Sequence, residues 1–141
     1  MARAHARIAD RRRDLLHQLS TRLVRENQTI VIEDLAVANM LQNRSLARAI
    51  SDAAWSQFRS MLEYKASWYG RRVVVVDRWP PSSKTCSGCG LVKDAMPLHI
   101  RMFHCAGCGL VLDRDHNAAL NILAAGRAVA ACGDGVRPIR R

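Results

Sequence analysis

The sequence predicts an α/β protein with a small parallel sheet followed by a metal-binding ribbon. Helical and strand-like patterns alternate twice in the first part of the chain, the order expected for parallel strands joined by a crossover helix. Both strand-like segments are continuous apolar runs, which is typical of parallel strands that are covered on both faces. Two Cys-x-x-Cys motifs then follow at ribbon spacing.

The first predicted element is an amphipathic basic helix over residues 3–26. Its apolar residues recur at helical spacing, at Ile8, Leu15, Leu16, Leu19, Leu23 and Val24. We expect this stripe to be core, whereas the arginines form either a solvated face or a phosphate-contacting one. Arg11, Arg12 and Arg13 are the candidate nucleic-acid contacts on this helix. Asn27 is expected to end the helix in a left-handed conformation.

Two strands are predicted at Thr29–Ile32 and Val73–Val76. Glu33 directly follows the first strand and Asp77 the second. Because ligands and catalytic groups collect at the carboxyl edge of an open α/β sheet, Glu33 is a candidate catalytic carboxylate. A solvated strand end is the alternative. Two strands make a marginal sheet, so the pattern predicts part of a larger one.

Between these strands, residues 35–44 are expected to form a loop. Helical periodicity returns from about Ser45 to Gly70, either as one helix or as two joined near Ser51. We expect its aromatic residues to be core, with base stacking as the alternative, at Trp55, Phe58, Tyr64, Trp68 and Tyr69. Pro80 to Ser83 mark the end of this half.

Four cysteines predict a structural zinc site. Cys86-Ser-Gly-Cys89 and Cys105-Ala-Gly-Cys108 are separated by fifteen residues, and each is followed by Gly, which allows the positive φ of a metal-binding knuckle. Disulfides or buried free thiols are the alternative. Four thiolates leave no open position for water, so such a zinc ion supports the fold rather than the chemistry.

A helix is predicted after the ribbon, preceded by Asp113 and Asp115. Acids before a helix are natural N-caps, so one of the two has a structural role available. A face of small and apolar residues able to pack close to a sheet is expected at Ala118, Ala119, Ile122 and Leu123. The tail is predicted to be basic and flexible from Gly126 onward.

The charge of the chain indicates a polyanionic partner. The formal net charge is +10, and nineteen of the twenty-two basic residues are Arg, the side chain suited to bidentate phosphate contacts. Nucleic acid is therefore favoured over a merely solvated surface. No apolar run of membrane-spanning length and no signal peptide are found, which predicts a cytoplasmic protein with reduced thiols and no membrane partner.

Longer motifs make the sequence similar to one known family. The chain closely resembles the OrfB/TnpB proteins of insertion sequences, known as transposases and as RNA-guided DNA endonucleases related to compact CRISPR nucleases. The resemblance rests on Ile30-Val-Ile-Glu33-Asp-Leu35, Leu62-Glu-Tyr-Lys65-Ala, Trp79-Pro-Pro-Ser-Ser-Lys84-Thr-Cys86-Ser-Gly-Cys89-Gly90 and Asp113-Arg-Asp115-His-Asn117-Ala-Ala-Leu-Asn121-Ile122. It implies an RNase H-like (RuvC) fold with the ribbon inserted before the last helix, laid out as residues 1–81, 82–112 and 113–141.

The resemblance also implies a reaction and a site. The family holds two Mg²⁺ ions with three carboxylates and cleaves DNA under the direction of a guide RNA. Glu33 matches the middle acid, and Asp115 matches the last because the family pattern places it two residues before Asn117. Lys84 is a further candidate nucleic-acid contact. The implied location is the prokaryotic cytosol, associated with the nucleoid when bound.

One segment of the family pattern is not found in this chain. The first carboxylate of the family lies on a strand that precedes the equivalent of residues 3–26, so we expect an incomplete RuvC fold that is inactive alone. A non-enzymatic zinc-ribbon protein that binds DNA or RNA is the alternative. In a third hypothesis, a separate N-terminal fragment supplies the missing strands in trans.

Overall fold

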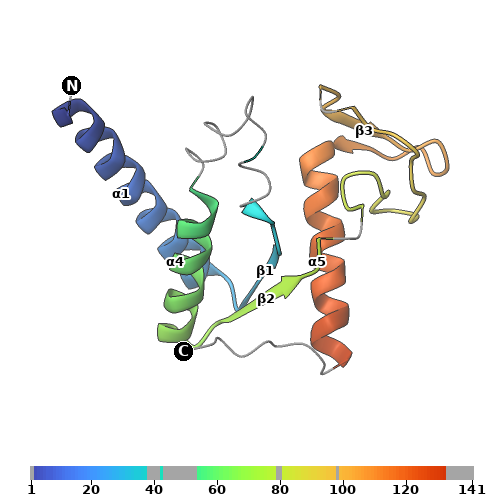
Figure 1. Ribbon diagram of the computed structural model, residues 1–141. Helices are drawn as coiled ribbons and strands as arrows, with labels where there is room; N and C mark the ends of the chain where they lie inside the picture. Colours follow the sequence, from blue (N-terminus) through green and yellow to red (C-terminus); the bar gives the residue numbers. More distant parts are fainter. Residues whose placement is uncertain (1, 38–41, 43–53, 79–80, 98, 133–141) are drawn as a thin grey trace. The chain divides into compact units, whose positions relative to one another are not determined.

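The computed structural model describes residues 2–37, 42, 54–78, 81–97 and 99–132 (Figure 1). The described elements are α1 (Ala2–Glu26), β1 (Thr29–Glu33), α4 (Trp55–Trp68), β2 (Arg72–Val76), β3 (Met102–His104), β4 (Val111–Asp113) and α5 (Arg114–Cys132). They fall into two compact units. The helical unit comprises Met1–Ile30 and Leu35–Val73, and the ribbon unit comprises Val31–Asp34 and Val74–Arg141. The layout of residues 1–81, 82–112 and 113–141 stays a prediction.

The basic helix is confirmed as α1, but the reason given for its end is wrong. Asn27 does not adopt a positive φ. Its backbone N–H and its side-chain Nδ2 both donate to the carbonyl of Leu23, at 3.1 and 2.9 Å. The side chain thus satisfies a terminal carbonyl that a left-handed residue would otherwise help to pair.

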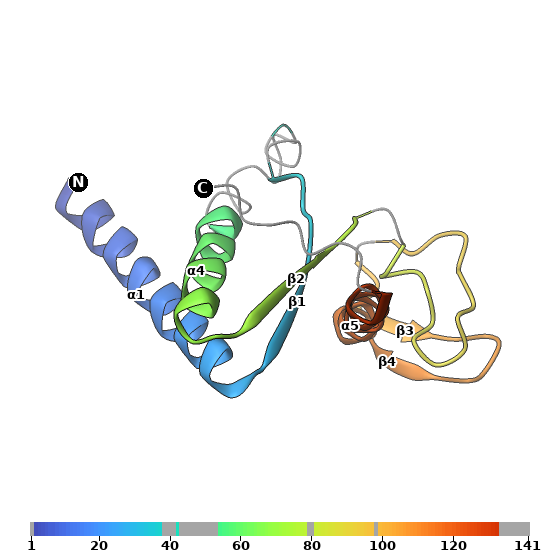
Figure 2. The same cartoon turned by 90° about the horizontal axis from the view of Figure 1, so that it is seen from below.

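Helices α1 and α4 pack side by side in the helical unit (Figure 2). Their contact buries an apolar core of Leu16, Val24, Met61, Leu62 and Ala66. The predicted stripe on α1 is therefore core in its second half only, because Ile8 and Leu15 are 55% and 61% exposed.

The expectation that the aromatic residues are core is wrong for three of them. Trp55, Trp68 and Tyr69 are 45%, 76% and 42% exposed. The buried residues of α4 lie in its middle, between Met61 and Ala66, whereas these aromatics stand at its two ends. Helical periodicity predicts which face is apolar but not how far along the helix a partner extends.

Strands β1 and β2 pair in parallel, as predicted. The N–H of Arg72 donates to the carbonyl of Gln28 at 3.0 Å, and farther along both strands the N–H of Asp34 donates to the carbonyl of Val76 at 2.9 Å. The two faces of these strands are not equally buried. Val74 and Val76 are buried, whereas the alternate residues of β2 and the apolar residues of β1 are only half-buried.

The ribbon unit joins an antiparallel hairpin directly to a helix. In the hairpin, β3 and β4 pair Phe103 with Leu112, and Asp113 is followed at once by α5. Phe103 is fully buried with Cys86 and Cys105. No helix among the described residues has the length and apolar content that crossing a membrane requires.

The packing face of α5 differs from the predicted one. Ala118 and Ile122 are half-buried as expected, but Ala119 and Leu123 are exposed. The close approach occurs instead at Gly126, where an added Cβ would lie 2.4 Å from Cγ1 of Val31 in β1. The prediction of a flexible tail from Gly126 onward is wrong as far as Cys132, because α5 continues to that residue. The predicted loop and helix at residues 38–41 and 43–53, and the rest of the predicted tail from residue 133, lie outside the described residues.

Candidate metal centre and carboxylate site

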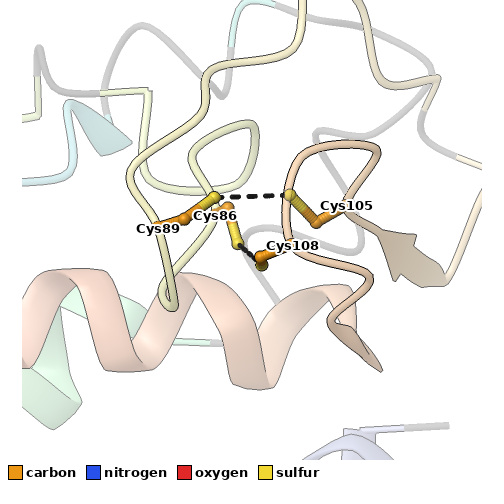
Figure 3. A group of neighbouring side chains, drawn as sticks. All are labelled: Cys86, Cys89, Cys105 and Cys108. Carbon is orange, nitrogen blue, oxygen red and sulfur yellow. Dashed lines mark hydrogen bonds between the residues drawn. The ribbon is translucent and has the colours of Figure 1, made fainter.

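The four predicted cysteine ligands converge in the ribbon unit (Figure 3). Their sulfur atoms all lie within 4.8 Å of one another. Across the two knuckles, Cys86 and Cys108 are 3.7 Å apart and Cys89 and Cys105 are 3.5 Å apart. A tetrahedral zinc ion with Zn–S bonds of about 2.3 Å requires sulfur separations of about 3.8 Å. The four thiols are free rather than paired as disulfides, and they could hold one metal ion.

The two knuckles are built alike. In the first, Cys86 N–H donates to the carbonyl of Leu91 and Gly90 N–H donates to the carbonyl of Cys86; the second repeats the pattern at Cys105, with Leu110 and Gly109. Gly90 and Gly109 adopt φ values of +79° and +74°. The predicted need for glycine at both positions is confirmed, because a side chain there would be strained.

The pKa values of the thiols differ within the cluster. The backbone N–H groups of Cys108 and Gly107 help to lower the pKa of Cys105 to about 6. The Leu91 N–H acts to lower the pKa of Cys89, yet hydrogen bonds with Cys105 and Cys108 raise it to about 12. Four thiols this close cannot all ionise without a cation among them, and a divalent metal ion supplies that charge.

Glu33 lies at the carboxyl end of β1, where the sequence analysis placed it. Its side chain is half-buried, and burial raises its pKa above the usual value. Desolvation of this kind disfavours the carboxylate form unless a cation lies nearby. A divalent ion bound at Glu33 would therefore restore the charged form.

Asp113 and Asp115 have different partners at the start of α5. The Asp113 carboxylate accepts hydrogen bonds from the N–H groups of His116 and Asp115, at 3.1 and 2.8 Å, and these bonds lower its pKa. Asp113 is thus the N-cap. The Asp115 carboxylate is exposed and faces Arg101 at 3.4 Å and Arg114 at 3.2 Å. The capping role therefore belongs to Asp113, which leaves Asp115 available for a ligand.

The contact between Gly126 and Val31 relates Asp115 to Glu33. Gly126 follows Asp115 by eleven residues, and at about 100° per residue the two lie within about 20° of the same line along α5. Val31 and Glu33 are two residues apart, so their side chains lie on the same face of β1. Asp115 thus lies on the same side of α5 as Gly126, about 16 Å farther along the helix axis, and Glu33 lies on the same face of β1 as Val31.

No third carboxylate completes this pair among the described residues. The cysteine cluster is the group of three or more His, Cys, Asp or Glu side chains that could hold a metal within that part of the chain. The assignment of Glu33 and Asp115 as catalytic acids stays a prediction.

The predicted nucleic-acid contacts are scattered. Arg11 is exposed on α1, Arg12 is half-buried, and Arg13 pairs with Asp10. The Lys84 amine donates to the carbonyl of Asp94 at 2.9 Å, which gives Lys84 a structural role in the ribbon. Binding of nucleic acid by these side chains stays a prediction.

Sequence reasoning missed two residues of the ribbon unit. Asn117 is fully buried and bonds to the backbone of Thr85 and Ser87, on either side of Cys86. Asn121 is half-buried and bonds to the backbone carbonyls of Ser82 and Thr85, before the first knuckle. Their spacing of four residues on one helix was the available signal.

Comparisons with known proteins assign the chain to a family. A family model described as "Cas12f1-like, TNB domain" matches residues 55–122, and a model described as "OrfB_IS605: Probable transposase" matches residues 1–44. Together they span most of the sequence. The chain belongs to the OrfB/TnpB family.

Curated relatives agree with this family. A Streptomyces pristinaespiralis protein named "Putative RNA-guided DNA endonuclease" is 67% identical over 140 residues, which cover 99% of this chain and 35% of that protein. The Escherichia coli K12 protein of that name, InsQ, is 38% identical over 159 residues, covering 99% of this chain and 39% of its own length. The OrfB/TnpB chain therefore spans little more than a third of the length of these relatives.

The fold also matches a solved structure. The Cas12f1 chain in the cryo-EM structure of the Cas12f1-sgRNA-target DNA complex superposes with a TM-score of 0.64. The two chains are 22% identical, and the match covers 84% of this chain and 35% of that chain. This likeness concerns the α/β fold of the OrfB/TnpB chain.

Proposed function

We propose that this chain is the C-terminal portion of a TnpB-type RNA-guided DNA endonuclease, with an incomplete RNase H-like (RuvC) nuclease site. Its curated relatives carry the endonuclease name, and the chain spans about a third of their length. Guide RNA and target DNA are the proposed partners, and the prokaryotic cytosol is the proposed location. The +10 charge supports a polyanionic partner.

The arrangement of α5 on β1 carries this proposal. The Gly126–Val31 contact and the helical phase support a site in which Asp115 and Glu33 project from facing sides of these two elements. Asp113 caps the helix, so Asp115 is not required for that role. Two carboxylates on facing surfaces suit a hard divalent cation such as Mg²⁺.

In the proposed site, Glu33 and Asp115 would hold Mg²⁺ together with a third carboxylate from outside the described residues. Bound Mg²⁺ supplies an activated water and stabilises the leaving oxygen of an in-line displacement at phosphorus. Glu33 is half-buried at a strand end and would act as a fixed ligand. Asp115 would exchange its pairing with the exposed Arg101 side chain for the cation, and Arg101 would then be available to contact phosphate.

The four-cysteine cluster is proposed to hold a structural zinc ion. Its sulfur separations fit tetrahedral coordination, and four thiolates leave no position for a reacting water. Zinc would hold the two knuckles together beside α5, and its role in the nuclease would be to support the helix that carries Asp115.

A chimeric protein tests the proposed nuclease site. The 141-residue chain would be joined to the part of the Streptomyces relative outside the 140 matched residues, and cleavage of a guided DNA target would be measured in Mg²⁺. We expect cleavage by the chimera, none by the isolated chain, and losses of at least about 10³-fold for Glu33→Ala or Asp115→Ala. Asp113→Asn is the matched control, because Asn also caps a helix.

Two results would contradict the nuclease proposal. One is Mg²⁺-dependent cleavage by the isolated chain that Glu33→Ala abolishes, because the chain would then contain a complete site. The other is undiminished cleavage by the Asp115→Ala chimera. Mixing the isolated chain with the separate remainder of the relative would decide whether the two parts also act in trans.

A non-enzymatic nucleic-acid-binding function is the second candidate, favoured by the Arg-rich charge. In that case the isolated chain should bind nucleic acid with strong salt dependence. Binding should survive Glu33→Ala and be lost when a chelator removes zinc. Absence of binding by the zinc-loaded chain near physiological salt would argue against this function.

A further inference from the structure

The side-chain amide of Asn117 connects α5 to the first cysteine knuckle. Its Oδ1 accepts the backbone N–H of Ser87 at 2.9 Å, and its Nδ2 donates to the backbone carbonyl of Thr85 at 2.7 Å. Thr85 and Ser87 are the two neighbours of Cys86. Asn117 therefore holds the backbone on both sides of one thiol ligand.

The hydrogen-bonding atoms of the Asn117 amide are occupied by the backbone around the knuckle. Asn117 is 0% exposed, and both polar atoms of its side chain are hydrogen-bonded. If the knuckle moved away, a buried donor and a buried acceptor would lose their partners, which is unfavourable. The position of the knuckle and the position of this turn of α5 are thus linked.

Asn121 adds support one turn later. Its Nδ2 donates to the carbonyls of Ser82 and Thr85, at 2.8 and 2.7 Å. Because Asn117 and Asn121 are four residues apart, they lie on one edge of α5. Unlike Asn117, Asn121 has no bond to a residue between the paired cysteines.

The same turn of α5 carries Asp115. Asn117 follows Asp115 by two residues, which is a rotation of about 200° around the helix axis. An amide fixed on the knuckle therefore turns Asp115 toward the opposite side of α5, where its carboxylate is exposed. The bond at Ser87 therefore helps to fix the rotation of the first turn of α5.

We propose that Asn117 is a positioning residue that couples metal binding by the four cysteines to the orientation of Asp115. Metal binding fixes Cys86, the backbone around Cys86 fixes the Asn117 amide, and Asn117 fixes the first turn of α5. The importance of Asp115 as a ligand rests on the proposed nuclease function. The coupling between the knuckle and α5 does not.

Amide hydrogen exchange of the 141-residue chain tests this coupling. The amides to follow are those of Asp115 and His116, which both donate to the Asp113 carboxylate in the first turn of α5. In the wild type, zinc should slow their exchange. In Asn117→Ala saturated with zinc, most of this slowing should be lost, and zinc affinity should fall by about 10- to 100-fold, as is usual for outer partners of metal ligands.

Linkage makes the test quantitative. If zinc orders the start of α5, then order at the start of α5 strengthens zinc binding by the same factor. The fold-loss of zinc affinity in Asn117→Ala should therefore match its fold-loss of zinc-dependent protection at Asp115 and His116. A purely local packing defect would change stability without this agreement.

Two further variants keep the test decisive. Asn121→Ala makes the same chemical change one turn later, leaves both Asn117 bonds intact, and should reduce the zinc-dependent protection less. Ser87→Pro removes the N–H that Asn117 accepts and leaves all four thiols in place. It should bind zinc but transmit less protection to α5. Cobalt(II)–thiolate absorption would verify that four thiols bind the metal in each variant.

Three results would overturn the proposal. The first is that zinc slows exchange of the Asp115 and His116 amides equally in the wild type and in Asn117→Ala. If Asn117→Ala does not fold, unchanged protection in Ser87→Pro would have the same meaning. Wild-type amides at the start of α5 that do not respond to zinc would also exclude the coupling. None of these depends on DNA cleavage, so failure of the coupling and failure of the nuclease proposal are distinguishable.

Discussion

Asp113 and Asp115 have different chemical roles although only one residue separates them. The Asp113 carboxylate is occupied by two backbone N–H groups, whereas Asp115 meets two arginine side chains at an exposed position. Exposed ion pairs contribute little stability, so a divalent cation can displace them at small cost. A helix N-cap is not replaced as easily, because its N–H groups have no other partner. These partners favour Asp115 over Asp113 as a metal ligand.

Lys65 is a buried lysine in the helical unit, and its amine is held by three hydrogen bonds. Its amine donates to the carbonyl of His17 and to the hydroxyls of Ser20 and Thr21, at 2.7, 2.8 and 2.7 Å. Burial lowers its pKa below the ordinary value. Ser20 and Thr21 also donate to carbonyls of their own helix, so loss of the amine leaves no donor unpaired.

We predict that Lys65→Met changes the free energy of unfolding by less than about 1.5 kcal/mol at neutral pH, the usual range for volume-conserving core replacements. The pH dependence should change as well. A lowered pKa means that the folded state releases its proton first, so the unfolded state binds more protons as pH rises. Stability of the wild type should therefore rise between the lowered pKa and the ordinary value, and Lys65→Met should lose this rise.

Urea unfolding at pH 7 and at pH 10 would measure both effects. Lys93→Met is the matched control, since it removes one lysine charge without touching the contact between α1 and α4. If Lys65→Met lost more than about 3 kcal/mol, the three hydrogen bonds would outweigh the desolvation of the amine.

At the scale of elements, α5 approaches β1 closely at Gly126 within the ribbon unit. Val31 occupies the space that a side chain at residue 126 would need: its Cγ1 and Cγ2 lie 2.4 and 2.6 Å from the position of an added Cβ. Valine is stiff and branched, so it cannot turn aside as a long side chain would. This contact sets which line of α5 meets β1.

We predict that Gly126→Ala destabilises the chain although alanine favours a helix. The gain in helix propensity is about 1 kcal/mol, whereas overpacking of a closed contact costs about 1–3 kcal/mol. In a Val31→Ala background the clash disappears, and Gly126→Ala should become neutral or stabilising. Urea unfolding of the four variants gives the coupling energy. Additive effects would show that α5 and β1 do not approach closely in solution.

The positions of the helices and strands were easier to predict from the sequence than the faces that they bury. Periodicity predicted α1, β1, β2 and the helix after the ribbon, because each pattern is local. It selected Ala119 and Leu123 for the buried face of α5, and both are exposed. Which face is buried depends on the neighbouring element, and the decisive residue, Gly126, carries no apolar signal. The aromatics at the ends of α4 were misassigned for the same reason.

How well each residue of the candidate site could be predicted from the sequence depended on how specific its motif is. The convergence of the four cysteines could be predicted from the sequence, because each Cys-x-x-Cys pair forms a knuckle within a single tight turn. Glu33 and Asp115 were identified through resemblance to a family, since an acid at a strand end or a helix start also has structural explanations. Asn117 stood in the quoted motif without a role, because its partners at Thr85 and Ser87 are distant in sequence.

The whole molecule combines a ribbon whose four cysteines could hold a metal ion with a strongly basic sequence, and the basic charge bears on the proposed binding of nucleic acid. The chain has a formal charge of +10, and its first helix contains many arginines. Charge of this kind produces binding that is strong at low salt and weak at high salt. It does not by itself distinguish a defined contact from a diffuse attraction, because both depend on salt.

Neutralising two sets of arginines on α1 separates these cases. Replacement of Arg11, Arg12 and Arg13 by Gln should reduce the slope of log K against log salt for duplex DNA by up to about 3, since each lost phosphate contact removes about 0.9. Replacement of Arg3, Arg7 and Arg22 by Gln removes the same charge from exposed positions of the same helix and should change the slope less. Fluorescence anisotropy over a range of salt concentrations measures both slopes. Equal changes would mean that the charge of α1 acts as a whole, and the assignment of contacts to Arg11, Arg12 and Arg13 would be wrong.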